Sequence, residues 1–191
     1  MKYKILSEEI VFKDHFTIKK ATIEHDSFVQ SEPVEVPRLC FERGDSVAIL
    51  LYETDTDTIL FTNQFRYPSI KEGDGWILEL TAGSVEEGEE PEVCANREIE
   101  EEIGYTGGKL AFISSFFVSP GGCSERIFLY TAEVQSTDKT AKGGGLESES
   151  EDIQLVKIPR DEIQSMLQNN EFRDAKTIIG LQWFMANHSV G

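Results

Sequence analysis

Acidic side chains are dense between positions 83 and 105 of this chain. These twenty-three residues hold nine glutamates and one arginine. Like charges one helical turn apart destabilise an isolated helix by about 0.2–0.5 kcal/mol per pair. A divalent cation would turn this repulsion into attraction, because carboxylate oxygens are the ligands that Mg²⁺ and Mn²⁺ prefer. The segment therefore has two interpretations, a cation site or a solvated acidic helix.

The same segment carries the local signals of a helix that begins at Pro91 and ends before Gly104. Proline suits the first helical turn, and glycine is a common stop signal at the end of a helix. On such a helix Glu98, Glu101 and Glu102 lie three and four positions apart and project side by side. An adjoining apolar stripe that can pack on a core consists of Ala95, Ile99 and Ile103.

The spacing of these residues resembles the signature of the Nudix hydrolases. That signature reads glycine, five residues, glutamate, seven residues, then Arg-Glu-aliphatic-any-Glu-Glu-any-Gly-aliphatic. Its glycine and charged positions are present here as Gly83, Glu89, Arg97, Glu98, Glu101, Glu102 and Gly104. The last aliphatic position holds Tyr105, which keeps the bulk but not the aliphatic character. The resemblance predicts a Nudix fold and a Nudix hydrolase.

The resemblance implies that a divalent cation takes part in cutting a pyrophosphate joined to some other group. Glu98 and Glu102 are then metal ligands, and Glu101 is a third. The backbone carbonyl of Ala82, just before the signature, is a further ligand in related pyrophosphatases. The expected cation is Mg²⁺, with Mn²⁺ as the alternative, because no set of histidines and cysteines accompanies these carboxylates.

Other positions of the signature are expected to shape the site. Arg97, counted with Glu101 among the catalytic residues, pairs with Glu89 and can reach Glu101 one turn further on. This ion pair would orient the loop on the helix. Gly83 and Gly104 are counted with Glu89 as structural residues of the signature.

Segments outside the signature resemble the ADP-ribose and GDP-mannose pyrophosphatases of this family. They are residues 64–68, 79–83, 119–122, 143–152 and 178–184. The substrate-binding residues that follow from this resemblance are Arg66, Tyr67, Glu79 and Pro120. Hydrolysis of ADP-ribose to AMP and ribose 5-phosphate is favoured over that of GDP-mannose to GMP and mannose 1-phosphate. A hydrolase of oxidised nucleotides and a non-catalytic ligand sensor are two further interpretations.

A second acidic segment, residues 147–152, follows a run of three glycines. In related ADP-ribose pyrophosphatases a glutamate on this loop acts as catalytic base when the loop closes. The resemblance puts Glu149 at that position, with Glu147 and Glu151 as near alternatives. The glycines would let the loop move. A charged surface loop without a catalytic role is the simpler alternative.

Charge and composition exclude several classes of partner. The net charge is −17, to which residues 83–105 contribute −8 and residues 147–152 contribute −4. Nucleic acid is not an expected partner, because it requires a basic face. No long apolar run or secretion signal is present, so a cytoplasmic protein that does not bind membranes is expected. The three cysteines are scattered and predict free thiols.

The elements that must position these residues follow from hydrophobic periodicity. Residues 1–44 alternate apolar and polar side chains and predict an N-terminal antiparallel β element. By resemblance this element joins two subunits into a homodimer, and residues 45–191 form the Nudix domain. Strands are expected at 46–53, 59–68, 76–83, 109–122, 125–134 and 152–159, and helices at 91–103, 160–169 and 175–187. This order predicts an α/β (α+β) fold in which a mixed sheet lies between helices.

Overall fold

The computed structural model describes residues 1–188, except for the side chain of Glu149. These residues fall into two compact units. The first unit consists of Met1–Asp45 and Phe116–Arg126, and the second of Ser46–Ser115 with the chain from Ile127 onward. The division into a dimerisation element over 1–44 and a Nudix domain over 45–191 stays a prediction.

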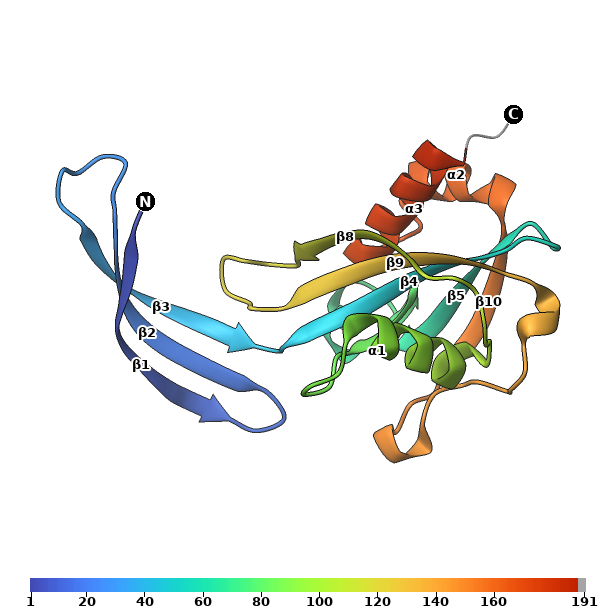
Figure 1. Cartoon of the computed structure of the whole chain (residues 1–191), viewed down its shortest axis with the longest axis horizontal. Helices are drawn as coiled ribbons and strands as arrows, with labels where there is room; N and C mark the ends of the chain where they lie inside the picture. Colours follow the sequence, from blue (N-terminus) through green and yellow to red (C-terminus); the bar gives the residue numbers. More distant parts are fainter. Residues whose placement is uncertain (189–191) are drawn as a thin grey trace. The chain divides into compact units, whose positions relative to one another are not determined.

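The first unit contains an antiparallel sheet with strand order β1-β2-β3, drawn in blue in Figure 1. Its strands are β1 (Tyr3–Lys13), β2 (Thr17–His25) and β3 (Val34–Glu42). Lys13 pairs with Thr17, so a short turn joins β1 to β2. Every residue of β1 is exposed, and β1 stands at the edge of the sheet order.

The second segment of the first unit is tied to the end of β3. The N–H of Phe41 donates to the carbonyl oxygen of Gly122 at 2.7 Å. The N–H of Gly122 in turn donates to the carbonyl oxygen of Ser119 at 3.1 Å. The strand predicted at 109–122 is therefore shorter than expected, because its last residues form a turn.

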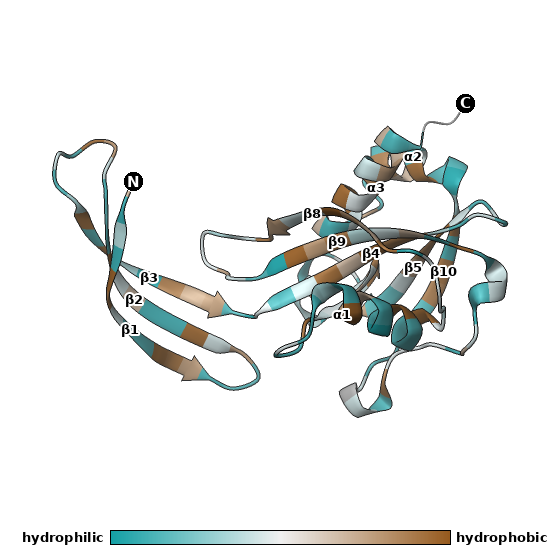
Figure 2. Cartoon of the chain, viewed as in Figure 1, coloured by the Kyte–Doolittle hydropathy of each residue, from teal (hydrophilic) through white to brown (hydrophobic). Residues whose placement is uncertain are grey.

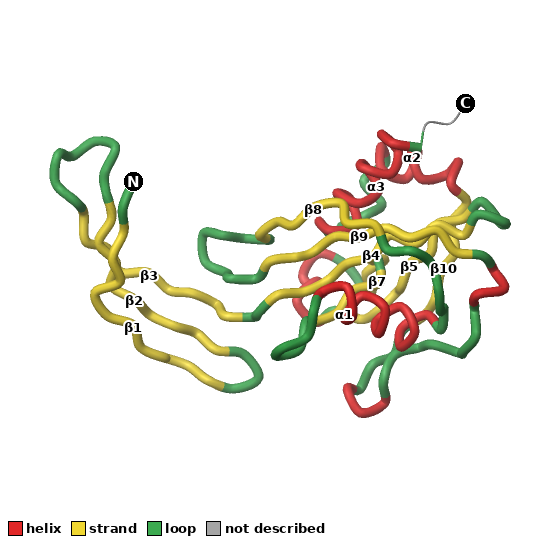
Figure 3. Tube along the Cα trace, in the orientation of Figure 1, coloured by secondary structure: helices red, strands yellow, loops and turns green. Residues whose placement is uncertain are grey.

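A second sheet has the strand order β10-β5-β4-β9-β8, and in addition β6 pairs with β5 and β7 with β4 (Figure 3). Its strands are β4 (Asp45–Glu53), β5 (Thr58–Phe65), β6 (Trp76–Glu79), β7 (Thr81–Ser84), β8 (Ala111–Phe117), β9 (Arg126–Val134) and β10 (Gln154–Pro159). The pairings of β4 with β5 and β7, and of β5 with β6 and β10, are antiparallel.

The helices of the second unit agree with the predicted ranges. They are α1 (Pro91–Glu98), which continues into the π-helical segment η2 (Ile99–Ile103), α2 (Arg160–Gln168) and α3 (Ala175–Asn187). Short 3-10 turns are η1 (Tyr67–Glu72), η3 (Ser136–Asp138) and η4 (Glu147–Glu149). The side chain of Asp174 caps α3 by accepting the N–H of Thr177 at 2.9 Å, which explains why this helix begins there.

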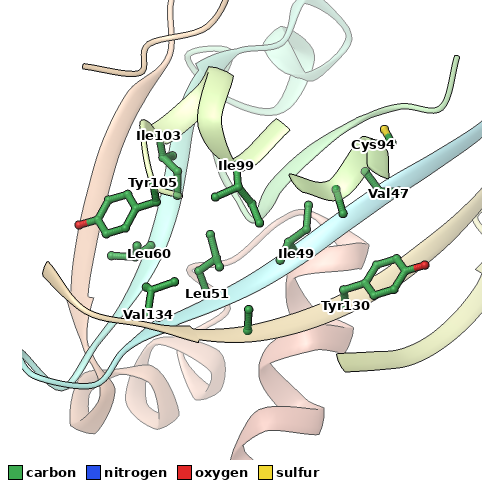
Figure 4. Close-up of a cluster of buried hydrophobic side chains, with 12 residues drawn as sticks. Val47, Ile49, Leu51, Leu60, Cys94, Ile99, Ile103, Tyr105, Tyr130 and Val134 are labelled. Atoms are coloured by element: carbon green, nitrogen blue, oxygen red, sulfur yellow. The ribbon is translucent and has the colours of Figure 1, made fainter. Parts of the chain in front are cut away.

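The core of the second unit lies on both faces of β4, because successive side chains of a strand point to opposite sides. Val47, Ile49 and Leu51 belong to one buried cluster with apolar residues of α1 and η2 (Figure 4). Leu50 belongs to the other face, where a Cβ atom on Gly180 of α3 would lie 3.7 Å from Leu50 Cδ1. The predicted sheet between helices is thus confirmed.

Two predicted strands are shorter or broken. The strand predicted at 59–68 ends where the chain enters η1, because Pro68 fixes the backbone and lacks an N–H group. The strand predicted at 76–83 is interrupted at Leu80. The N–H of Leu80 donates to Oγ1 of Thr177 in α3 at 2.9 Å, and β6 and β7 then pair with different strands.

Candidate active site

The carboxylates of the signature lie on α1 and η2, shortly after β7. Strand β7 is held in the sheet by β4, with Ala82 opposite Ala48. Pro91 is the first residue of α1, and Gly104 ends η2 with a φ of 75°, a backbone conformation that favours glycine. The π-helical form of η2 could not be predicted from the spacing of the signature residues. Such π-helical turns are frequent at functional sites.

Arg97 connects the loop to the helix through a network of ion pairs. Its Nε lies 3.1 Å from Glu89 Oε1, and its Nη1 lies 2.7 Å from Glu98 Oε1 and 2.9 Å from Glu101 Oε2. The guanidinium of Arg97 lowers the pKa of Glu89 to about 2 by hydrogen bonding. The expected contacts of Arg97 with Glu89 and Glu101 are therefore present in this structure.

Glu98 and Glu102 are the buried carboxylates of the site, with 8% and 3% of their surface exposed. Burial raises the pKa of Glu98 to about 7, although Arg97 opposes the shift. Burial likewise raises the pKa of Glu102. The N–H of Ala82, which donates to Glu102 Oε2 at 3.1 Å, opposes this shift. Two buried carboxylates whose charged forms are destabilised make a place that a cation would stabilise.

Gly83 leaves the space that the carboxylate of Glu98 occupies. A Cβ atom at this position would lie 1.9 Å from Glu98 Oε1 and 2.0 Å from its Cδ. No side chain can be accommodated there without moving the carboxylate, which explains the glycine at the start of the signature.

The donor set fits a hard cation, but no complete ligand shell is already assembled. In the part of the chain that the structure describes, no three His, Cys, Asp or Glu side chains are arranged to hold one metal ion. Glu101 is turned toward Arg97. Glu98 and Glu102 lie close enough that, in addition to burial, the charge of Glu98 raises the pKa of Glu102, and the backbone N–H of Ala82 contacts Glu102.

The three glycines of the second acidic segment pack on the end of η2. The N–H of Gly144 donates to the carbonyl oxygen of Glu102 at 2.8 Å, and the N–H of Gly145 donates to that of Glu101 at 3.1 Å. A Cβ atom on Gly143 would lie 2.6 Å from the backbone of Ile103. These glycines, expected to give flexibility, thus permit a close approach of the loop to the helix that carries the carboxylates.

The loop carboxylates are only partly placed. The side chain of Glu149 lies outside the described residues, so its role as catalytic base stays a prediction. Glu151, one of the near alternatives, accepts the N–H of Leu146 at 3.0 Å. Its charge is among those that raise the pKa of Glu98 and of Glu102, so it lies near that pair.

Arg66 stands beside the buried pair and is held by Glu79. Its Nε donates to Glu79 Oε1 at 2.6 Å and its Nη2 to Glu79 Oε2 at 3.4 Å. The charge of Arg66 lowers the pKa of Glu102, against the dominant effect of burial. Two predicted substrate residues are thus brought together next to a predicted metal ligand. Sequence reasoning missed Lys176, whose ammonium group also binds Glu79.

A sequence model of the NUDIX domain matches residues 42–179. The chain belongs to the NUDIX family. The predicted family, fold and hydrolase class are confirmed, because the signature, the fold and this match agree.

Relatives of this NUDIX hydrolase include two kinds of pyrophosphatase. The ADP-ribose pyrophosphatase of Haemophilus influenzae is 34% identical over 191 residues, which cover 97% of this chain and 87% of that protein. The GDP-mannose pyrophosphatase of Salmonella arizonae is 31% identical over 189 residues, 98% of this chain and 97% of the relative. A crystal structure of ADP compounds hydrolase has the same fold, with a TM-score of 0.77 at 21% identity over 100% of this chain and 98% of the other.

The tyrosine at the end of the NUDIX signature has a structural explanation. Tyr105 is fully buried, and its hydroxyl donates to Oε2 of Glu53 at 2.5 Å. Glu53 also accepts from Nζ of Lys157 at 2.6 Å. An aliphatic residue would leave the carboxylate of Glu53 without this donor, and no short-range pattern in the sequence connects these three positions.

Two further predicted substrate residues of this NUDIX chain are Tyr67 and Pro120. Tyr67 begins η1 and is 74% exposed. This exposure fits both a residue that contacts a ligand and an ordinary surface residue. Pro120 lies in the turn that follows β8, in the first unit. The roles of both residues stay predictions.

Proposed function

We propose that this chain hydrolyses the diphosphate bond of a nucleoside diphosphate sugar, with ADP-ribose as the favoured substrate. The observation that carries the proposal is the buried pair of Glu98 and Glu102 with the guanidinium of Arg66 beside it. Carboxylates alone would repel a diphosphate. A cation held by the carboxylates, together with an arginine, makes such a place suitable for one.

The proposed cation is Mg²⁺, with Mn²⁺ as the alternative. Glu98, Glu102 and the carbonyl of Ala82 would hold it, with Glu101 as a further ligand if it leaves Arg97. When bound, the cation would neutralise phosphate oxygens and lower the pKa of a water molecule that attacks phosphorus.

The chain's own residues have distinct roles in this proposal. Arg66 binds an oxygen of the diphosphate through its free edge, and Glu79 fixes its orientation. Arg97 holds the carboxylate of Glu98 in place before substrate arrives, and it keeps Glu101 in reserve until that side chain leaves the ion pair. Glu149 accepts the proton of the attacking water when the loop is closed.

GDP-mannose is the second candidate substrate, because a GDP-mannose pyrophosphatase aligns with nearly all of this chain. Turnover of ADP-ribose and GDP-mannose by the purified chain with Mg²⁺, with the products identified by chromatography, tests both. We expect AMP and ribose 5-phosphate to form faster than GMP and mannose 1-phosphate. A faster release of GMP would reverse the order of the two substrates. Hydrolysis of neither, by folded protein with Mg²⁺ bound, would contradict the proposal and favour a ligand sensor.

A homodimer is the proposed assembly, formed through the sheet β1-β2-β3. Strand β1 is an edge strand whose exposed backbone can pair with another strand. It also exposes Ile10, Val11 and Phe12, each about half accessible or more, along the hydrophobic end of the strand seen in Figure 2. Sedimentation at micromolar concentration should give twice the chain mass, and a stable monomer would refute this assembly.

The proposed location is the cytoplasm. Within residues 1–188, no helix has both the length and the apolar character needed to cross a membrane. Fractionation of cells that express the chain would test the location.

A further inference from the structure

Thr81 is a buried polar residue beside the proposed cation site, and the function proposed above gives it no role. It is the first residue of β7, and none of its surface is exposed. Among the residues that the structure describes, its Oγ1 has no hydrogen-bond partner. A buried hydroxyl without a partner destabilises the folded state, so a function elsewhere in the protein's cycle is the natural reason to keep it.

Other buried threonines of the second unit do have partners for their hydroxyls. Oγ1 of Thr177 accepts the N–H of Leu80 at 2.9 Å. Oγ1 of Thr62 donates to the carbonyl oxygen of Glu79 at 3.4 Å. Thr81 therefore differs from the buried threonines around it in the bonding of its hydroxyl and not in its burial.

The side chain of Thr81 points to the face of the sheet that carries the signature carboxylates. Thr81 pairs with Ile49 of β4, and residues directly opposite in an antiparallel pair share one face. Ile49 lies in the buried cluster with Ile99 of η2 (Figure 4). Two positions further along β7, and so on the same face, a Cβ atom on Gly83 would meet the carboxylate of Glu98.

The carboxylate of Glu102 lies next to the peptide group that follows Thr81. Its Oε2 accepts the N–H of Ala82, the next residue of β7, at 3.1 Å. Carboxylates that bind metal ions are usually held by hydrogen bonds from neighbouring groups, which fix their orientation. A threonine hydroxyl can donate one hydrogen bond, so Thr81 places a donor of this kind beside Glu102.

We propose that Thr81 is a positioning residue for the proposed cation site: when Glu102 binds a divalent cation, the hydroxyl of Thr81 donates a hydrogen bond to its carboxylate. This inference rests on the proposed function, which places the cation at Glu98 and Glu102. The hydrogen bond fixes the carboxylate in the orientation that binds the cation. Direct contact of Thr81 with substrate is disfavoured, because the residue is completely buried.

Calorimetric titration of Mg²⁺ into the full chain, together with thermal unfolding in a chelator, tests this role. Thr81→Val keeps the branched shape of the side chain and removes the hydroxyl. It should weaken Mg²⁺ binding by about tenfold to a hundredfold, the usual loss when a hydrogen-bond partner of a metal ligand is removed. In the chelator it should raise the melting temperature by about 2 °C or more, because an unpartnered hydroxyl has left the interior.

Two further variants separate the hydroxyl from the packing around it. Thr81→Ser retains the hydroxyl and should bind Mg²⁺ about as well as the original chain, although the loss of a buried methyl group lowers its melting temperature. Thr131→Val is the matched control, since Oγ1 of Thr131 in β9 donates to the carbonyl oxygen of Leu50 at 3.0 Å. It should lower the melting temperature in the chelator and leave the affinity for Mg²⁺ unchanged.

Three results would overturn this inference alone and leave the proposed cation site intact. If Thr81→Val binds Mg²⁺ as tightly as the original chain, the hydroxyl does not act on the site. If Thr81→Val and Thr81→Ser lose affinity equally, packing matters and the hydroxyl does not. If Thr81→Val melts at a lower temperature in the chelator, the hydroxyl has a structural partner in the metal-free protein. Absence of Mg²⁺ binding by the original chain would instead contradict the proposed cation site itself, and this inference with it.

Discussion

Glutamates are buried at two places in the second unit, and their pKa values are shifted in opposite directions at the two places. Glu53 is fully buried, yet its pKa is lowered: burial raises it, but hydrogen bonds from Lys157, Thr56 and Tyr105 outweigh burial. Glu98 and Glu102 are buried to a similar degree, yet the pKa of each is raised. Burial alone therefore does not distinguish a structural carboxylate from a functional one.

The difference between the two places lies in their partners. Glu53 receives Lys157 Nζ at 2.6 and 2.8 Å, Thr56 Oγ1 at 2.6 Å and Tyr105 OH at 2.5 Å. Glu102 receives the N–H of Ala82, and Glu98 shares the guanidinium of Arg97 with Glu89 and Glu101. A buried carboxylate short of positive partners is unstable by itself and marks a place where a ligand completes the structure. This contrast is the reason for placing the cation at Glu98 and Glu102.

The largest expected effect is a loss of turnover when a carboxylate of the proposed cation site is replaced. Glu98→Gln should reduce turnover by orders of magnitude, because it removes a charged oxygen ligand of the cation while keeping the shape of the side chain. Its free energy of unfolding without metal should not fall, since the substitution removes a destabilised charge. Turnover with Mg²⁺ and chemical denaturation in a chelator measure both. Unchanged turnover would refute the assignment of Glu98 as a metal ligand.

A smaller loss is expected from displacing the same carboxylate. Gly83→Ala places a Cβ atom where Glu98 Oε1 lies, at 1.9 Å. A shift of about 1 Å in a reacting group can cost about 100-fold in rate, so we expect kcat to fall by about that factor. Gly88→Ala, in the same loop, has open space at its Cβ position but a positive φ, which Gly83 lacks, so it measures the cost of backbone strain in this loop without a clash. Equal losses in both variants would point to distortion of the loop and not to displacement of Glu98.

A substitution beside Glu53 should change the stability of the fold and leave catalysis unchanged. Lys157→Met leaves the carboxylate of Glu53 buried without its cation, and we expect the free energy of unfolding to fall by about 2 kcal/mol. Because the side chain of Lys157 is 36% exposed, this is less than the loss of a fully buried pair. Denaturant titration measures the change, and kcat well below the melting temperature should stay near its original value. A large fall in kcat would mean that Glu53 and the metal ligands are not independent.

The smallest expected effect is a pH-dependent loss of stability when a hydrogen-bond donor to Glu53 is removed. Tyr105→Phe removes one donor to Glu53 and should lower the free energy of unfolding by about 1 kcal/mol at pH 7. Since the folded state lowers the pKa of Glu53 below 4.5, its contribution is present above pH 4.5 and is lost as the pH falls below that value. The difference between Tyr105→Phe and the original protein should therefore shrink below pH 4.5. A difference independent of pH would mean that the hydroxyl acts through packing alone.

Elements with strong local signals could be predicted from the sequence. The helix α3 begins at Ala175 as expected, because Asp174 supplies a capping side chain. The signature helix ends at Gly104 as expected, since its left-handed backbone favours glycine. Arg97 and Glu89, placed by the signature, meet as predicted.

Features that depend on distant contacts could not be predicted. The break at Leu80 arises from Thr177, ninety-seven positions away, and the pairing of Glu53 with Lys157 spans 104 positions. Lys176 lies two residues after the capping residue Asp174, in a helix whose other residues are uncharged, and this position alone does not indicate that it reaches Glu79. Such contacts are set by how strands and helices pack, which periodicity does not determine.

Calorimetric titration of Mg²⁺ into the chain, compared between Glu102→Gln and Glu100→Gln, tests the central claim most directly. Both residues lie on η2, but Glu102 is buried in the site whereas Glu100 is exposed. If the buried pair is a cation site, Glu102→Gln should lose Mg²⁺ binding and Glu100→Gln should bind it like the original chain. Equal binding by the two variants would contradict the account.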